Sequence, residues 1–293
     1  MEETLQLQQT ERKKGLSTAA LKWIALGLMV LDHIHYFFGF TGWVPEAFTM
    51  LGRLSANLFL FCVVEGFAHT HDRKRYFLRI WAIGAAMGAV LTAFMFVPAL
   101  QRPDGFYPYN GVLLNFVILL PMLQGVDWLR QKRFGRGLAA LLLPLAWPVL
   151  ISLGAGLLPL PGAAKLGLTL MGFTVLPMWN FINDGGLFFI LTGLLLYLCR
   201  GHKWLQAGTY VIFTMLVWFV RVWLQVSAMG EPLGTMFTQY YEWFSVFSVL
   251  FMLCYNGQKG KGGKISKHFF YVFYPAHVYI LHALSWGLYL ILQ

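Results

Sequence analysis

Nine apolar segments of roughly bilayer-spanning length make up most of this 293-residue chain. About 20 apolar residues are enough for a helix to cross the hydrocarbon core of a bilayer. Inside that core the backbone satisfies its hydrogen bonds only in helices or closed barrels, and continuous apolar runs differ from the alternating pattern of barrel strands. The chain is therefore expected to be all-α, a polytopic membrane bundle. The expected spans are residues 20–40, 48–68, 76–98, 109–127, 138–158, 184–199, 206–226, 236–255 and 268–290.

Composition excludes the main soluble alternatives. Hydrophobic residues make up 58% of the chain and charged residues 12%, which leaves too little polar surface for a water-soluble globule. The formal net charge of +10 is spread over short loops without a clustered recognition element, so it does not indicate a nucleic-acid partner. Membrane topology and anionic lipid account for it.

The weaker apolar stretch at 163–180 decides the topology. If it is re-entrant or lies at the surface, 18 of the 22 Lys and Arg residues fall on one side, with only Arg53, Arg102, Lys165 and Arg221 elsewhere. The positive-inside rule favours that arrangement. We therefore expect nine spans in an inner or plasma membrane, with a cytosolic N-terminus and the C-terminus outside.

We expect one domain over residues 1–293. Residues 1–19 form a polar cytosolic segment, and the first span has no small-residue cleavage site typical of a removable signal peptide. The three cysteines lie within spans and lack metal-ligand spacing, so we interpret them as packing residues and expect no metal.

Polar residues within the spans are the strongest indication of a functional site, because a charge in the bilayer needs a partner or a water-filled cavity. They are Asp32, His33, His35, Arg53, Glu65, Arg79, Arg221, His277 and His282.

The first two spans supply the best candidates. Asp32 and His33 lie near the bilayer midplane and point about 100° apart, so they need different partners. His33 is a candidate general base, and Asp32 is a candidate orienting group. Arg53 is deep enough to meet Asp32, whereas Glu65, some 18 Å further along, is expected to pair with Arg79.

The last span adds a second candidate base. Tyr274 and His277 share one helix face, and Pro275 removes a backbone donor beside them. His282 is rotated away from His277, so the two histidines are not expected to share a role, and we expect His282, like Glu65, only to support the site. Arg221, near the end of its span, fits either a supporting role or a side chain that reaches the interface.

Four motifs together resemble the TraX family. They are LKWIALGLMVLDHIHYF in the first span, GRLSANLFLFCVVEGF in the second, RYFLR at the start of the third, and FFYVFYPAHVYILH in the last. The prototype of that family is a membrane acetylase that modifies the N-terminus of conjugative pilin. The resemblance carries over Asp32, His33, Arg53, Glu65, Arg79, Tyr274 and His277.

The resemblance implies acyl transfer from acetyl-CoA to an amine or hydroxyl. A neutral imidazole suits removal of the acceptor's proton, and Arg53 or Tyr274 would stabilise the oxyanion. Acetyl-CoA would enter from the basic face. Its candidate phosphate contacts are Arg79, the DRKR run with Arg73, Lys74 and Arg75, and the loop at 256–267. The acceptor stays open between a pilin, another exported peptide and a cell-surface sugar.

Two other classes of function remain open. A secondary transporter would also place carboxylates and histidines along a polar path, and 163–180 with its Gly and Pro residues would suit a broken helix. A non-catalytic assembly protein of the pilus or envelope would use the same polar residues to hold helices together.

Overall fold

The computed structural model describes residues 14–260 and 264–293. The expected polar segment at the N-terminus and the loop at 256–267 therefore lie partly outside the described residues. The longer helices are α2 (Thr18–Phe38), α3 (Ala47–His69), α4 (Arg73–Phe96), α5 (Val112–Arg130), α6 (Phe134–Leu157), α7 (Gly162–Phe173), α8 (Gly186–Leu198), α9 (Lys203–Met229) and α12 (Lys264–Leu292). The short ones are η1 (Gly39–Thr41), η2 (Pro98–Leu100), η3 (Trp179–Phe181), α10 (Thr235–Thr238), η4 (Tyr241–Phe247) and α11 (Ser248–Leu253).

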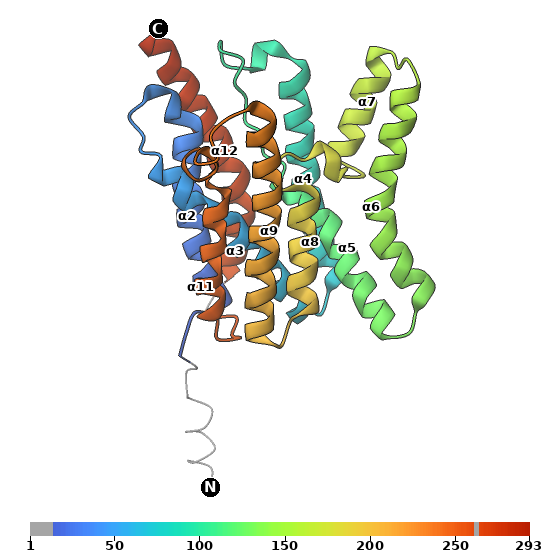
Figure 1. Ribbon diagram of the computed structural model, residues 1–293. Helices are drawn as coiled ribbons and strands as arrows, with labels where there is room; N and C mark the ends of the chain where they lie inside the picture. The colour runs from blue at the N-terminus through green and yellow to red at the C-terminus, as the bar shows by residue number, and fades with distance from the viewer. Residues whose placement is uncertain (1–13, 261–263) are drawn as a thin grey trace.

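The helices form one bundle with its long axes roughly aligned (Figure 1). Within the described residues, seven helices are long and apolar enough to cross a membrane, and they coincide with seven of the expected spans. The other two expected spans, 184–199 and 236–255, correspond to shorter apolar helices at Gly186–Leu198 and Tyr241–Leu253. The expected fold class, a polytopic helical membrane bundle, is confirmed.

The stretch at 163–180 does not cross the bundle as one helix. α7 has 12 residues and is about 18 Å long, well short of a bilayer core of about 30 Å. In Figure 1, α7 starts beside the end of α6 and stops near mid-height, where η3 leads into α8. The chain is therefore interrupted at mid-depth between α7 and α8.

Four loops, together with the helix ends that adjoin them, carry most of the described Lys and Arg residues and lie at the end of the bundle where α2 begins, which we call the basic end (Figure 1). They join α3 to α4, α5 to α6, α8 to α9 and α11 to α12. The opposite end, where α12 finishes, is called the far end. Which membrane face each end meets stays a prediction.

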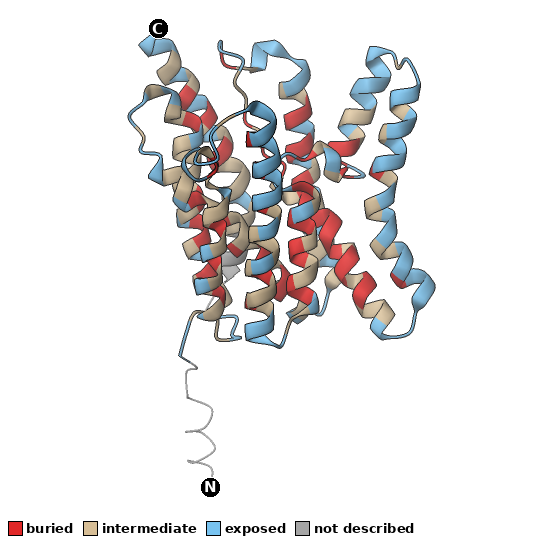
Figure 2. Ribbon diagram, in the orientation of Figure 1, coloured by how far each residue is buried: buried red, intermediate tan, exposed pale blue. Residues whose placement is uncertain are grey.

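The core is centred on α3 and α5. The buried side chains Leu60, Phe61, Leu119 and Met122 belong to one cluster there. By contrast, α6 is mostly exposed in Figure 2, with side chains such as Leu157 open to the surroundings. Apolar side chains on such a surface are favourable in contact with lipid but would be unfavourable in contact with water.

α2 and α3 approach each other closely at Gly52. A Cβ atom on Gly52 would lie 2.2 Å from the Cβ of Asp32. Only glycine allows this approach, and it brings Asp32 against the helix that carries Arg53.

Arg102 holds the α4–α5 loop against the far end. It is 4% exposed, forms two hydrogen bonds of 2.9 and 2.8 Å with Asp104, and lies over the rings of Phe40, Phe106 and Tyr289. Its hydrogen bonds lower the pKa of Asp104. The loop that follows therefore has a fixed place beside α2.

Candidate functional site

Asp32 and Arg53 meet between α2 and α3. Arg53 Nη2 lies 3.7 Å from Asp32 Oδ1, as their depths predict, and Thr49 bridges the two. The Thr49 hydroxyl donates to Asp32 Oδ1 at 3.1 Å, and Arg53 Nη2 donates to Thr49 Oγ1 at 2.7 Å. Arg53 Nε is buried without a partner in the described part of the chain. The guanidinium therefore keeps a donor free beside the carboxylate.

His33 and His277 come from opposite ends of the chain and lie side by side. Their ring centroids are 4.7 Å apart, with the rings nearly perpendicular. His33 Nδ1 is 2.8 Å from the carbonyl oxygen of Met29, and His277 Nδ1 is 2.9 Å from that of Phe273. A carbonyl only accepts, so Nδ1 carries the hydrogen in both rings and Nε2 of a neutral ring keeps its lone pair.

Packing fixes the His277 ring. It stacks on Phe273 at 5.0 Å with an interplanar angle of 9°, and the Tyr274 ring is 5.7 Å away. His277 is buried, and its Nε2 has no hydrogen-bond partner among the described residues. The two predicted bases and Tyr274 therefore form one group next to the Asp32–Arg53 pair.

His282 and Arg221 lie elsewhere, although both were expected to support the site. His282 is buried among aromatic rings, including Phe94 at 5.1 Å and Trp286 at 5.8 Å. Arg221 is exposed on α9 and lies over the ring of Phe188. The separation of His282 from His277 follows from their rotation on α12.

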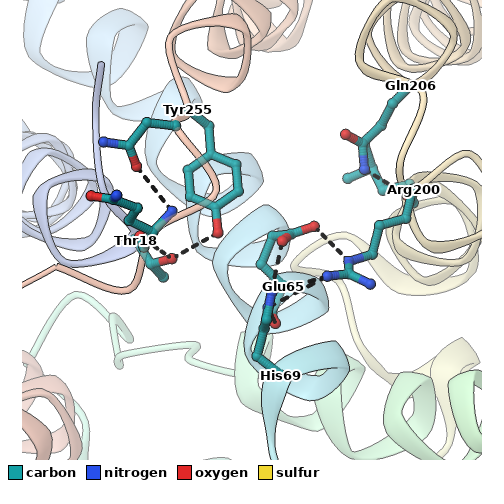
Figure 3. Close-up of polar contacts among 9 residues, drawn as sticks. Thr18, Glu65, His69, Arg200, Gln206 and Tyr255 are labelled. Carbon is teal, nitrogen blue, oxygen red and sulfur yellow. Dashed lines mark hydrogen bonds and ion pairs between the residues drawn. The ribbon is translucent and has the colours of Figure 1, made fainter. Parts of the chain in front are cut away.

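The predicted Glu65–Arg79 pair is wrong. Glu65, buried at the basic end, binds Arg200 from the α8–α9 loop, with Arg200 Nε 3.0 Å from Glu65 Oε1 (Figure 3). His69 Nδ1 lies 3.7 Å from the other carboxylate oxygen, and Arg200 Nη2 is 3.2 Å from His69 Nε2. Arg79 instead lies exposed on α4. The two residues were paired because their expected depths in the membrane were similar. In the structure, however, they lie on helix faces that do not face each other.

We expect Arg200→Met to lower the free energy of unfolding by roughly 3 kcal/mol, because it leaves the buried Glu65 carboxylate without its main counter-ion. Thermal unfolding in detergent measures this. Arg75→Met, which removes an exposed pair with Asp72, is the control and should change stability by less than about 1 kcal/mol. Adding Glu65→Gln to Arg200→Met should restore most of the loss. An Arg200→Met protein as stable as the control would contradict this account of the cluster.

The basic residues proposed to contact acetyl-CoA differ in their surroundings. Arg73 binds Asp127 at 2.7 Å and Gln124 at 2.9 Å, so it ties α4 to α5. Arg75 pairs with Asp72 at 3.3 Å, and Lys74 is exposed. Lys74 and Arg79 are therefore the members of this set with the most accessible charge.

Two cavities open near the group, and the sequence did not reveal them. The Glu46 cavity, of about 300 Å³, is lined by His35, Glu46, Thr49, Arg53, Thr238, Gln239, Tyr241 and Glu242. The tyrosine cavity, of about 360 Å³, is lined by Tyr36, Gly105, Phe106, Tyr107, Tyr109, Asn183 and Asp184. Both lie in the half of the bundle toward the far end, because each is lined by a residue from the last turn of α2, and the Glu46 cavity also by the first turns of α3.

Asp184 is the functional candidate that sequence reasoning missed. It sits in the break between α7 and α8, where Gly111 N–H donates to its Oδ2 at 3.0 Å. It lies close enough to Arg53 and Asp32 to interact electrostatically with both. The Asn-Asp-Gly-Gly run at 183–186 was its signal, because such a run breaks a span rather than starting one.

The described residues contain no cluster of three His, Cys, Asp or Glu side chains that could hold a metal ion. The chemistry available is that of two imidazoles, a carboxylate, a guanidinium and a phenol inside a helical bundle. These features define a class: polytopic membrane proteins with a polar site enclosed by their helices.

The comparisons with known proteins narrow the class. A family model described as TraX protein matches residues 17–160 and 185–285. The chain belongs to the TraX family. Neither a curated protein nor a solved structure matches it. Residues 161–184, which hold α7 and Asp184, fall between the two matched parts.

Proposed function

We propose that this protein is a membrane acyltransferase that moves an acetyl group from acetyl-CoA to an amine or hydroxyl acceptor, such as the N-terminus of a pilin or another exported peptide. The observation that carries the proposal is the pair His33 and His277, each with its Nδ1 bonded to backbone and its Nε2 lone pair available. The Asp32–Arg53 pair lies beside them. Family membership supports the same reading.

The proposed reaction needs a base and a group that stabilises negative charge. The lone pair of the acceptor nitrogen or oxygen forms a bond to the thioester carbon, and a histidine Nε2 takes the proton from the attacking amine or hydroxyl. The carbon–sulfur bond then breaks, and the imidazolium returns the proton to the leaving thiolate as CoA thiol. An acceptor that begins as an ammonium releases one further proton to solvent before attack. Arg53 or Tyr274 stabilises the intermediate oxyanion, worth roughly 3 to 4 kcal/mol per donor.

The two substrates approach from opposite ends in this proposal. Acetyl-CoA is anionic and enters at the basic end, which we place in the cytosol, with Lys74 and Arg79 as its first contacts. Asp32 lies about 21 Å along α2 from Thr18, in the half toward the far end. The acceptor reaches it through a cavity on that side.

One observation favours a second candidate, a secondary transporter. Transporter binding sites are often built from helices broken near mid-depth, and the chain is interrupted there between α7 and α8. Asp184 lies in this break. A transporter would bind its cargo without any need for a thioester.

Binding and slow hydrolysis of labelled acetyl-CoA by the detergent-purified protein separate the two candidates. We expect saturable binding and a release of acetate above the rate in buffer, neither of which requires knowledge of the acceptor. Desulfo-acetyl-CoA analogues with an unreactive carbon in place of sulfur should bind without turnover. Folded protein that binds no acetyl-CoA would overturn the acyltransferase and favour the transporter.

A further inference from the structure

The tyrosine cavity has the chemical make-up of a site for an organic cation. Its walls include three tyrosines and a phenylalanine, and Asp184 lies among them. Faces of aromatic rings attract ammonium groups, and a carboxylate supplies the opposite charge. A volume of about 360 Å³ suits one small group or the end of a chain.

Asp184 forms no close ion pair with the described residues, and Arg53 interacts with its carboxylate only from a longer distance. Among the described residues, no Lys, Arg or His nitrogen lies within 4.0 Å of its carboxylate. Its one hydrogen bond is the 3.0 Å bond from Gly111 N–H to Oδ2. A partly buried carboxylate in an apolar surrounding is costly unless it takes up a proton or a counter-charge joins it, so a ligand with a positive charge would stabilise the ionised form of Asp184.

The cavity walls are fixed before any ligand arrives. Tyr109 N–H donates to the Tyr36 hydroxyl at 3.1 Å, and the Tyr109 hydroxyl bonds the carbonyl oxygen of Phe181. The Asn115 side-chain amide donates to the Asp184 carbonyl oxygen at 2.6 Å. A wall already ordered in this way lowers the entropic cost of binding.

The cavity adjoins the histidine pair. The Tyr36 ring, one wall of the cavity, lies 6.4 Å from the His33 ring in an edge-on arrangement. A group held against Asp184 is therefore separated from the proposed base by one aromatic side chain. A bound amine would be placed beside the group that removes its proton.

We propose that the tyrosine cavity is the acceptor subsite and that it binds a primary ammonium group, held by Asp184 and the rings of Tyr36, Tyr107 and Tyr109. The role as acceptor subsite rests on the proposed acetyl transfer, whereas ammonium binding does not. Asp184 is here a positioning residue. The subsite discriminates against hydroxyl acceptors, because they bring no charge to the carboxylate.

Equilibrium dialysis with labelled alanine amide tests the proposal on the full-length protein in detergent, without acetyl-CoA. Lactamide, which has a hydroxyl in place of the ammonium, is the matched probe, and tri-alanine amide distinguishes a peptide end from a small free amine. We expect saturable binding of the two amines and none of lactamide at the same concentration. Equal binding of alanine amide and lactamide would overturn the subsite.

The variants locate the binding. Asp184→Asn should raise the dissociation constant of alanine amide by at least about tenfold, and Tyr107→Leu by several-fold. Glu242→Gln, a carboxylate change in the Glu46 cavity, should leave it unchanged. If Asp184→Asn does not fold, Tyr107→Leu decides alone. Unchanged affinity in a folded Asp184→Asn or Tyr107→Leu protein excludes this site.

The outcome stays separate from that of the proposed function. The protein could bind alanine amide through Asp184 but neither bind nor hydrolyse acetyl-CoA. That result would support the cation site and exclude the acetyl transfer. Hydrolysis of acetyl-CoA without binding of alanine amide would support the acetyl transfer and exclude the acceptor subsite.

Discussion

His33→Ala should lower the rate of acetyl-CoA hydrolysis by roughly 100-fold to 10,000-fold, the usual contribution of a positioned general base. The reason is the hydrogen bond from Nδ1 to the Met29 carbonyl, which leaves Nε2 as the acceptor of the proton. The substitution removes that acceptor and adds no charge.

The same measurement on His277→Ala assigns the two roles. If His33 alone is the base, His277→Ala should cost less, because it removes only the ring that packs at 4.7 Å against His33. Comparable losses in both variants would indicate that the two imidazoles share the proton. His202→Ala, at the exposed start of α9, is the control. Wild-type rates in both folded variants would rule out histidine catalysis here.

Gly52→Ala should damage both stability and activity. Its new Cβ would lie 2.2 Å from Asp32 Cβ and 2.5 Å from Asp32 Oδ1. Rotating the Asp32 side chain cannot relieve the first contact, because Cβ is fixed to the backbone, so α2 and α3 must separate. Overpacking of this kind costs about 1 to 3 kcal/mol, and the separation also pulls Asp32 away from Arg53.

Gly27→Ala is the matched control for this experiment. It lies on α2 as well, but a Cβ there meets nothing within 4 Å, and alanine favours a helix over glycine. Thermal unfolding and acetyl-CoA hydrolysis should therefore be unchanged or slightly improved in Gly27→Ala and reduced in Gly52→Ala. Equal behaviour of the two variants would show that the α2–α3 contact is not critical.

Much of the fold could be predicted from sequence because membrane helices are specified locally. A run of apolar residues is both the signal and the cause of a span, so the seven long helices coincide with expected ones. The interrupted segment was harder, since α7 is apolar like a span but has only 12 residues. Its glycines and prolines marked a weak point without giving its depth.

The site was predicted in part for a similar reason. Asp32 and Arg53 lie on neighbouring helices joined by a short loop, so depth alone was enough to pair them. The partner of Glu65, Arg200, is 135 residues away in the sequence. The expected depth of a residue in the membrane does not predict which neighbouring helix its side chain faces. The tyrosine cavity arises where a loop folds over a broken helix, and no local pattern encodes that arrangement.

The spacing of the two polar clusters on α3 has an electrical consequence. Arg53 borders a cavity, whereas Glu65 belongs to the cluster at the basic end, and the helix between them measures about 18 Å. Buried Leu58, Leu60 and Phe61 fill that interval. A membrane voltage would drop mainly across this thin apolar layer instead of the whole bilayer. Moving one elementary charge across the layer would then involve electrical work of about 2.3 kcal/mol per 100 mV. In the proposed reaction, the uncharged thioester end of acetyl-CoA could be carried through this layer to the site near Arg53 without that electrical work, whereas a free proton could not.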